Sequence, residues 1–303
     1  MRLLLFILVC LIFSPLLILG LIVYTYRVRR HSIPQKISGT ANEPYGSRLV
    51  MHVAGTRKDA AAYALSGHFP VFSRFVHYSM IKVFHLALLI SGYKGSFVSY
   101  PGPRPSSLAT FISHRTAFFD EVIKEALIRP DNPARQFVVL GAGFDTRCYG
   151  LPEGADVKCF EVDMAPTLTA QLEGLKSAGV AHDHVFFVET DFNQQAWFDA
   201  LVEAGFDTRL TTFVLWEGVT MYLNEDALLH TLKLAARLPT VSEIAFDYFS
   251  GSLINHYPPY DKFVSRMMTS AIKFYEAALQ YCIRTRSPAR AKLENHFGRA
   301  HFC

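Results

Sequence analysis

The chain has 303 residues, of which 50% are hydrophobic and 18% are charged, and its formal net charge is +4 at pH 7. A chain of this length and composition can bury a sizeable core, which excludes a wholly disordered protein and predicts one large domain or two small ones. No broad basic face accompanies the modest charge, so we expect no nucleic-acid partner.

Cysteine and histidine form no pattern that is typical of a metal site. The five cysteines have no CxxC spacing and their number is odd, which argues against a disulfide framework or a zinc site and favours a reducing compartment. His182 and His184 have no further ligands nearby in the sequence, and two histidines do not complete a coordination shell. We therefore predict no metal.

The N-terminus is an almost unbroken apolar run from Leu3 to Tyr26. About 20 such residues cross the hydrocarbon core of a bilayer as a helix, and Pro15 and Gly20 are tolerated inside such helices. A cleaved secretory signal is the alternative, but its apolar region usually has about 7–15 residues and ends at a small-residue cleavage site. We therefore predict a single-pass transmembrane helix.

A basic cluster follows this run directly. It consists of Arg27, Arg29, Arg30, His31 and Lys36, whereas only Arg2 and the terminal amine precede the run. Because basic residues are enriched on the cytoplasmic side of membrane segments, the cluster predicts that the rest of the chain faces the cytoplasm.

The region after the basic cluster has a weaker pattern. Residues 31–59 carry Pro, Gly, Ser and Asn with little periodicity, and we predict a tether there. Tyr78–Tyr93 is a second apolar segment, which is interrupted by Lys82 and His85 and is too short to span a membrane comfortably. We expect it to be a core helix or a helix on a membrane surface.

From residue 107 onward, helical and strand patterns alternate. The predicted helices are Ser107–Ile128, Thr167–Ala178, Gln194–Ala204 and one from Asn224 to about Leu238. The predicted strands are Phe137–Leu140, Val157–Asp163, Val185–Thr190, Thr211–Trp216 and Glu243–Phe249. This alternation is typical of βαβ units, so we expect an α/β, Rossmann-like fold with a mainly parallel sheet and helices on both faces.

Ligands of such sheets bind at the carboxyl ends of the strands. The first strand ends in GAGFDTR, in which Gly141 and Gly143 permit a tight turn and a close approach of the backbone to a ligand. A dinucleotide fingerprint would place a third glycine or alanine where Thr146 stands. The second strand ends in EVD, whose Asp163 lies about 20 residues past the glycines, where a carboxylate can accept hydrogen bonds from ribose hydroxyls.

The third and fourth strand ends also carry carboxylates. ETDF contains Asp191 and Phe192, an acid and an aromatic ring that suit an adenine amino group and its ring, although Asp191 could instead cap the next helix. WEGVTMYL places Glu217 directly after an apolar strand, where a carboxylate is costly to bury without a cationic partner such as an ammonium group.

In this order and spacing, GAGFDTR, EVD, the DF pair and WEGVTMYL resemble the leucine carboxyl methyltransferase family over roughly Ser107–Phe249. The resemblance implies a class I methyltransferase fold with S-adenosylmethionine as the cofactor. The cofactor-binding residues that it implies are Arg115, Gly141, Gly143, Asp163, Asp191, Phe192 and Glu217. Arg115 belongs to SHRT, an S-x-R-T pattern whose arginine grips the cofactor carboxylate in this family, whereas without the resemblance it would be interpreted as a solvated helix residue.

The domain organisation follows from these patterns. We expect a transmembrane anchor with its basic flank at 1–30, a tether at 31–59, an N-terminal helical region on the substrate side at 60–105, a methyltransferase domain at 106–286 and an irregular tail at 287–303. The family's sheet closes with a C-terminal hairpin, but here Tyr260–Arg286 predicts one long helix, so we expect that hairpin to be missing. The N-terminal anchor is a second departure from soluble relatives.

The acceptor of the methyl group is less defined. A carboxylate is itself the nucleophile, whereas a hydroxyl needs a general base, and the sequence does not rank Tyr222, His256 or Tyr257 for that role. We expect a membrane-tethered enzyme that methylates a carboxylate or hydroxyl oxygen of a small molecule or a protein carboxylate, and we assign no catalytic residue. A catalytically impaired, membrane-bound interaction module is the alternative, and an NAD-dependent oxidoreductase is disfavoured by Thr146 and Glu217.

Overall fold

The computed structural model describes residues 1–94, 108–192, 197–255, 266, 269–270, 272–275 and 279. Its centre is a five-stranded sheet of order β3-β2-β1-β4-β5, in which every neighbouring pair is parallel. The strands are β1 (Gln136–Leu140), β2 (Lys158–Asp163), β3 (Val185–Glu189), β4 (Thr212–Trp216) and β5 (Glu243–Phe246). Every residue of β1 and β4 is buried, as expected for central strands that are covered on both faces.

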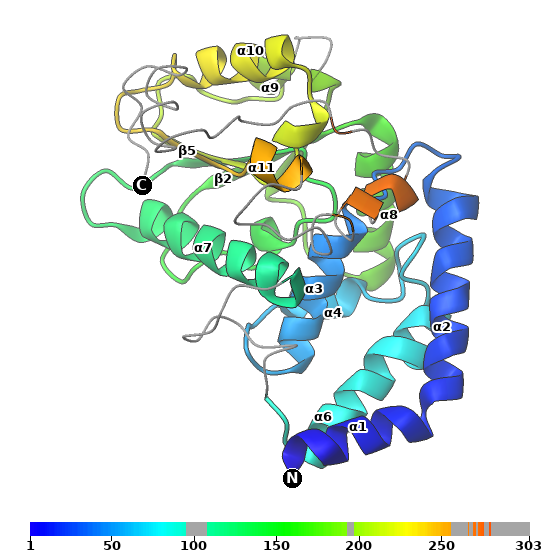
Figure 1. Cartoon of the computed structure of the whole chain (residues 1–303). Helices are drawn as coiled ribbons and strands as arrows, with labels where there is room; N and C mark the ends of the chain where they lie inside the picture. The colour runs from blue at the N-terminus through cyan, green and yellow to red at the C-terminus, as the bar shows by residue number, and fades with distance from the viewer. Residues whose placement is uncertain are drawn as a thin grey trace.

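Helices cover both faces of the sheet (Figure 1). The longer ones that follow the strand pattern are α7 (Leu108–Ile128), α8 (Ala165–Ala178), α9 (Trp197–Glu203) and α10 (Glu225–Ala235). Alternate residues of a strand point to opposite faces, so Val138 packs in one core cluster with α9 and α10, and Val139 packs in another with α7. The predicted α/β fold with a parallel sheet is confirmed, and the boundaries of its elements differ from the predictions by a few residues.

The shorter elements of the chain connect these layers. They are the 3-10 helices η3 (Arg147–Tyr149) and η5 (Thr220–Tyr222), and α11 (Gly251–Ile254) after the last strand. Within the described residues the sheet has five strands. Most of the predicted helix Tyr260–Arg286 lies outside the described residues, as do the tail at 287–303 and the two residues His256 and Tyr257.

Residues 31–59, where we expected a tether, contain a packed helix. α3 (Asn42–Val53) is followed by α4 (Ala60–Leu65), and α3 contacts both α4 and α7. The side chains of Tyr45, Leu49 and Val53 repeat every four residues along one face of α3 and are buried in a core cluster. The interpretation of residues 31–59 as a simple tether is therefore wrong for this helix. The sequence analysis missed the helix because its apolar periodicity is confined to one short segment.

The apolar N-terminus is bent. α1 (Arg2–Ile12) and the helical stretch made of α2 (Ser14–Arg27) and the π-helix η1 (Val28–Ser32) meet at 68°. Pro15 lies in the first turn of α2, and its ring provides no backbone N–H for a hydrogen bond that would continue α1. No single helix among the described residues is long and apolar enough to cross a membrane, although the bent pair together meets that description. The expected continuous helix over Leu3–Tyr26 is therefore not supported.

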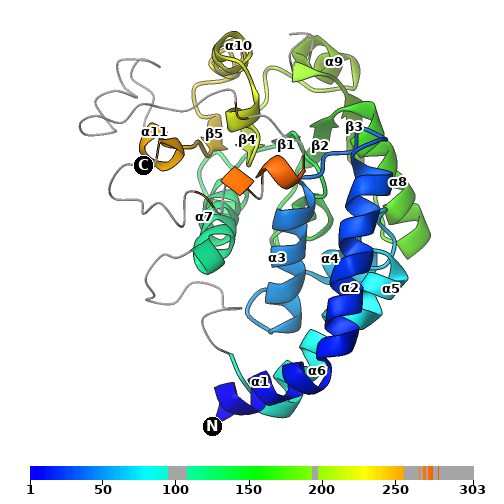
Figure 2. The same ribbon diagram turned by 45° about the vertical axis from the view of Figure 1, so that its right-hand side comes forward.

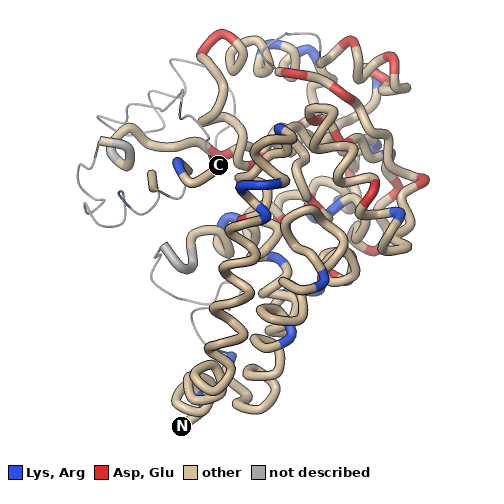
Figure 3. Tube along the Cα trace, turned by 90° about the vertical axis from the view of Figure 1, so that its right-hand side faces the viewer, with Lys and Arg blue, Asp and Glu red and all other residues tan. Residues whose placement is uncertain are grey.

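The N-terminal helices form an arm with a second helical stretch. This stretch runs through α5 (Arg74–Val76), the π-helix η2 (His77–Lys82) and α6 (Val83–Ser91). α1 packs along α6, and α2 packs beside α5 and η2. We call residues 2–32 and 74–91 the arm; it extends away from the sheet (Figure 2), and its trace carries Lys and Arg but no Asp or Glu (Figure 3).

Candidate functional site

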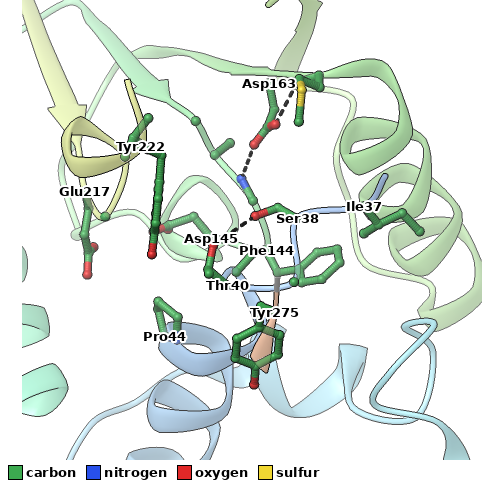
Figure 4. Close-up of a pocket in the computed structure, with 18 of the residues that line it drawn as sticks. Ile37, Ser38, Thr40, Pro44, Phe144, Asp145, Asp163, Glu217, Tyr222 and Tyr275 are labelled. Carbon is green, nitrogen blue, oxygen red and sulfur yellow. Dashed lines mark hydrogen bonds between the residues drawn. The ribbon is translucent and has the colours of Figure 1, made fainter. Parts of the chain in front are cut away.

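A cavity of about 490 Å³ lies at the carboxyl ends of β1, β2 and β4. The strand order reverses between β1 and β4, and open α/β sheets bind their ligands at such a switch point. The cavity is lined by the glycine turn, by residues that follow the other strands, by the segment from Ile33 to Arg48, and by Tyr275 (Figure 4). The lining residues include Gly141, Gly143, Asp145, Asp163, Asp191, Phe192, Glu217, Tyr222, Ile33, Lys36, Ile37, Thr40, Pro44, Arg48 and Tyr275.

The glycine turn requires glycine at two positions. Gly141 has a φ of +66° and Gly143 a φ of +56°, values at which other residues are strained. A Cβ atom on Gly141 would lie 2.4 Å from a methyl group of Val219, and one on Gly143 would lie 2.8 Å from the Cβ of Ala41. The turn is therefore close-packed on both sides, and its backbone forms a wall of the cavity.

Asp163 ends β2 and connects it to the glycine turn. Its Oδ2 accepts a hydrogen bond of 2.7 Å from the backbone N–H of Gly143, and its Oδ1 accepts one of 2.7 Å from that of Met164 (Figure 4). Burial raises the pKa of Asp163 to about 6, although the two backbone hydrogen bonds act to lower it. The carboxylate is held in place while it lines the cavity, so it can accept hydrogen bonds from a ligand's hydroxyl groups.

Asp191 and Phe192 follow β3 and line the same cavity. Phe192 is buried beneath α9, where its ring centroid lies 6.3 Å from that of Trp197. This contact fixes the ring at the wall of the cavity that Asp191 also lines. The structure thus brings together the pair that the sequence places at the third strand end.

Glu217 follows β4 and is surrounded by guanidinium groups. Its Oε1 accepts a hydrogen bond of 2.8 Å from Nε of Arg115, and its Oε2 accepts one of 2.7 Å from Nη1 of Arg147. Burial acts to raise the pKa of Glu217, but the two arginines outweigh it and hold that pKa below its usual range. Glu217 is therefore an ionised carboxylate on the cavity wall.

Arg115 is not a solvated helix residue. Only 11% of its side chain is exposed, and besides Glu217 it donates a hydrogen bond of 3.0 Å from Nη1 to Asp247. Arg115 does not line the cavity itself but lies behind Gly218, which does: a Cβ on Gly218 would be 3.6 Å from Nη1. The structure therefore places Arg115 and Glu217 together, about a hundred positions apart in sequence.

Several residues of this charge cluster were not predicted. Arg48 on α3 pairs with Asp145 at 3.1 Å, and Arg147 pairs with Asp145 and with Asp120 on α7. Nε of Arg48 is buried without a hydrogen-bond partner. The sequence interpretation of GAGFDTR used only its two glycines. The last three residues of this motif, Asp-Thr-Arg, contain Asp145 and Arg147 and were the sequence signal for the charge cluster.

Part of this chain is similar in sequence to known bacterial proteins. A protein of Mycolicibacterium vanbaalenii named "Putative S-adenosyl-L-methionine-dependent methyltransferase" is 35% identical over 122 residues, which cover 40% of this chain and 39% of that protein. YktD of Bacillus subtilis strain 168, which carries the same description, is 33% identical over 142 residues, which cover 46% of this chain and 45% of YktD. The chain thus matches less than half the length of these relatives.

A solved structure described as an O-methyltransferase family protein from Burkholderia thailandensis superposes with a TM-score of 0.40 at 12% identity, covering 84% of this chain and 89% of that one. The family model of the leucine carboxyl methyltransferases matches residues 70–236, which is more than half of the chain and includes Arg115, the glycine turn, Asp163 and Glu217. The cavity-lining segment between η1 and α3 precedes this match. The chain therefore belongs to the leucine carboxyl methyltransferase family.

Proposed function

We propose that the chain is an S-adenosylmethionine-dependent methyltransferase whose cofactor lies in the cavity at the strand ends. The observation that carries this proposal is the position of Asp163, which is fixed by the N–H of Gly143 and lines the same cavity as Glu217. The residues present fit this cofactor, because the cavity offers carboxylates for the ribose and the ammonium group, and Arg115, behind Gly218 and paired with Glu217, lies near enough to serve the cofactor's carboxylate.

In such a reaction the bound cofactor supplies a methyl group on a sulfonium that is already activated. The chain itself then has to bind the cofactor and orient it toward the acceptor. Asp163 would accept hydrogen bonds from the ribose hydroxyls, Phe192 would lie against the adenine with Asp191 near its amino group, and Glu217 would hold the ammonium group. Arg115 would direct part of its guanidinium group toward the carboxylate of the cofactor from behind Gly218.

Isothermal titration with S-adenosylmethionine and with NAD tests this assignment. We expect binding of the first and none of the second, because Thr146 stands where a dinucleotide turn has its third glycine. Binding of NAD alone would favour an oxidoreductase, and binding of neither would favour an interaction module built on the same fold.

We further propose that the acceptor oxygen belongs to a carboxylate rather than to a hydroxyl. Of the candidate bases that the sequence names, Tyr222 lines the cavity, but burial raises the pKa of its hydroxyl and makes it harder to ionise, whereas an ionised carboxylate acceptor needs no base. The exposed side chain of Lys36 also lines the cavity and would attract an anionic acceptor. Incubation of cell extract with methyl-labelled cofactor tests this: a methyl ester releases labelled methanol in mild base, whereas a methyl ether does not.

Replacing Lys36 with alanine is expected to raise KM for the acceptor so identified by about 2- to 5-fold, the size of one exposed ion pair. Neither kcat nor the affinity for S-adenosylmethionine should change. Lys36→Arg keeps the charge and serves as the matched control. A weaker cofactor affinity in Lys36→Ala, with KM unchanged, would contradict this role.

We also propose that the apolar N-terminus tethers the protein to a membrane with the catalytic domain on the cytoplasmic side. The apolar character of the run and the basic cluster after it, which would be attracted to the anionic lipids of the cytoplasmic leaflet, support this arrangement. The protein is then expected to stay in the membrane fraction after carbonate washing, and its C-terminal domain should be cleaved by protease added from the cytosolic side.

A further inference from the structure

The arm exposes an unusual amount of apolar surface. Most of the exposed large hydrophobic side chains among the described residues lie on it, and the most exposed include Leu4 at 71%, Leu89 at 70% and Ile12 at 65%. Leu4 and Ile12 belong to α1 and Leu89 to α6, which pack against each other at the end of the arm (Figure 2). Exposed apolar side chains in such number, on helices that pack together, mark a contact with a membrane or with another protein.

The charge of the arm selects between these partners. The arm contains six Lys and Arg residues and no Asp or Glu, so the remainder of the chain is net negative (Figure 3). Basic residues beside an apolar surface are typical of helices that lie in the interface of a membrane with anionic lipids. A second copy of the chain would instead bring two arms of the same charge together.

Two exposed basic residues lie where the arm joins the rest of the chain. The exposed apolar side chains of α2 end at Tyr26, and Arg29 and Arg30 follow as exposed residues of η1. This end of the arm is fixed to the cavity, because the hydroxyl of Tyr24 is hydrogen-bonded at 2.8 Å to the hydroxyl of Tyr275, which lines the cavity. Headgroups bound at Arg29 and Arg30 would therefore lie beside the cavity.

We propose that the arm inserts into one leaflet of an anionic phospholipid membrane, with Arg29 and Arg30 at the headgroups. This inference rests on the proposed tethering and deepens it, because the bend of 68° and the packing against α6 turn α1 out of line with α2, so that α1 lies across the end of the arm and does not continue α2 through the bilayer (Figure 2). It does not depend on methyltransferase activity.

Flotation of the full-length protein with vesicles tests the lipid contact. Vesicles of phosphatidylcholine and phosphatidylglycerol should bind the protein, and the variant Arg29→Glu/Arg30→Glu should bind them more weakly by about 30-fold or more, which corresponds to the loss of two basic residues at an anionic surface. Lys233→Glu/Arg237→Glu makes the same charge change on exposed residues near α10 and should bind normally. Equal affinities of the two variants would overturn the role of Arg29 and Arg30.

The apolar contact has its own matched pair of variants. Leu4→Glu/Leu89→Glu should abolish flotation, whereas Val202→Glu/Val241→Glu, at two exposed positions away from the arm, should not. If wild-type protein does not float but forms dimers that Leu4→Glu/Leu89→Glu dissociates, the arm contacts a second copy and the proposal is wrong.

An N-terminal epitope tag separates insertion into one leaflet from spanning. Protease added outside sealed vesicles should remove the tag and also cleave the catalytic domain, because both lie on one side. A protected tag with an accessible catalytic domain would establish a spanning segment and overturn the proposal. Titration of the same variants with S-adenosylmethionine keeps the two proposals apart, because cofactor binding should be unchanged whether or not the arm binds lipid.

Discussion

Asp163→Asn is expected to weaken S-adenosylmethionine binding by about 10- to 100-fold near neutral pH. The ionised carboxylate would accept hydrogen bonds from the ribose hydroxyls, and charge-assisted bonds of this kind contribute roughly 1.5–3 kcal/mol. Asparagine keeps the size of the side chain, but its one oxygen can accept from only one of the two N–H groups, that of Gly143 or that of Met164. Calorimetric titration measures the loss. The melting temperature without cofactor should fall modestly, because the amide leaves one backbone N–H without an acceptor while the removal of a buried charge offsets part of that cost.

The pH dependence of binding identifies the carboxylate as the cause. Burial raises the pKa of Asp163 to about 6 in the free protein, so its carboxyl group is ionised at neutral pH and becomes neutral as the pH falls through that value. If only the ionised form binds, affinity should fall about fourfold between neutral pH and about pH 5.5. The Asp163→Asn variant should lack this component, and the cofactor's own titration cancels in the comparison. Parallel pH profiles of the two proteins would show that Asp163 does not bind the ribose.

The parts of the fold that follow from local patterns could be predicted from the sequence. The buried strands β1 and β4 are continuous apolar runs, and such runs between helical segments identify a parallel sheet without any knowledge of distant contacts. The carboxyl ends of these strands necessarily meet at one edge. Gly141, Asp163 and Glu217 could therefore be assigned to one cavity from their positions alone.

The contribution of α3 could not be predicted in the same way. Arg48 is nearly fully buried, and what makes an arginine tolerable there is its pairing with Asp145, which lies 97 positions later. Sequence periodicity reports which face of a helix is apolar, but not which distant carboxylate compensates a buried cation. The spacing of Tyr45, Leu49 and Val53 was the one local signal that residues 42–53 are more than a tether.

The bend in the apolar N-terminal run could not be predicted from its composition. Its length and apolar composition are sufficient for a helix that spans a membrane, but composition does not show whether the helix runs straight or bends. The bend between α1 and α2 depends on Pro15 and on the surface that α6 offers to α1. Proline is tolerated in membrane helices and also begins helices, so the same residue was compatible with both structures.

Glu217 is the anion that several cations of the site share. It accepts hydrogen bonds from Arg115 and Arg147, and Nη1 of Arg48 lies 4.0 Å from its Oε2. Removing one partner of a buried ion pair leaves an uncompensated charge, so Glu217→Ala should lower the free energy of unfolding by about 3–5 kcal/mol. Asp156→Ala is the matched control, because Asp156 pairs with Arg135 at the surface and should cost at most about 1 kcal/mol. Chemical denaturation measures both values.

The same cluster should distinguish the two ends of the cofactor. S-adenosylmethionine carries an ammonium and a carboxylate that adenosine lacks, so Arg115→Ala and Glu217→Gln, which is milder than Glu217→Ala, should weaken the cofactor by about tenfold or more and adenosine hardly at all. Asp163→Asn should weaken both, because adenosine retains the ribose. Arg115→Lys keeps one positive charge but cannot reach Glu217 and Asp247 through two separate nitrogens as Arg115 does, so an intermediate loss is expected. Equal losses of cofactor and adenosine in Arg115→Ala would mean that Arg115 only stabilises the fold around Glu217.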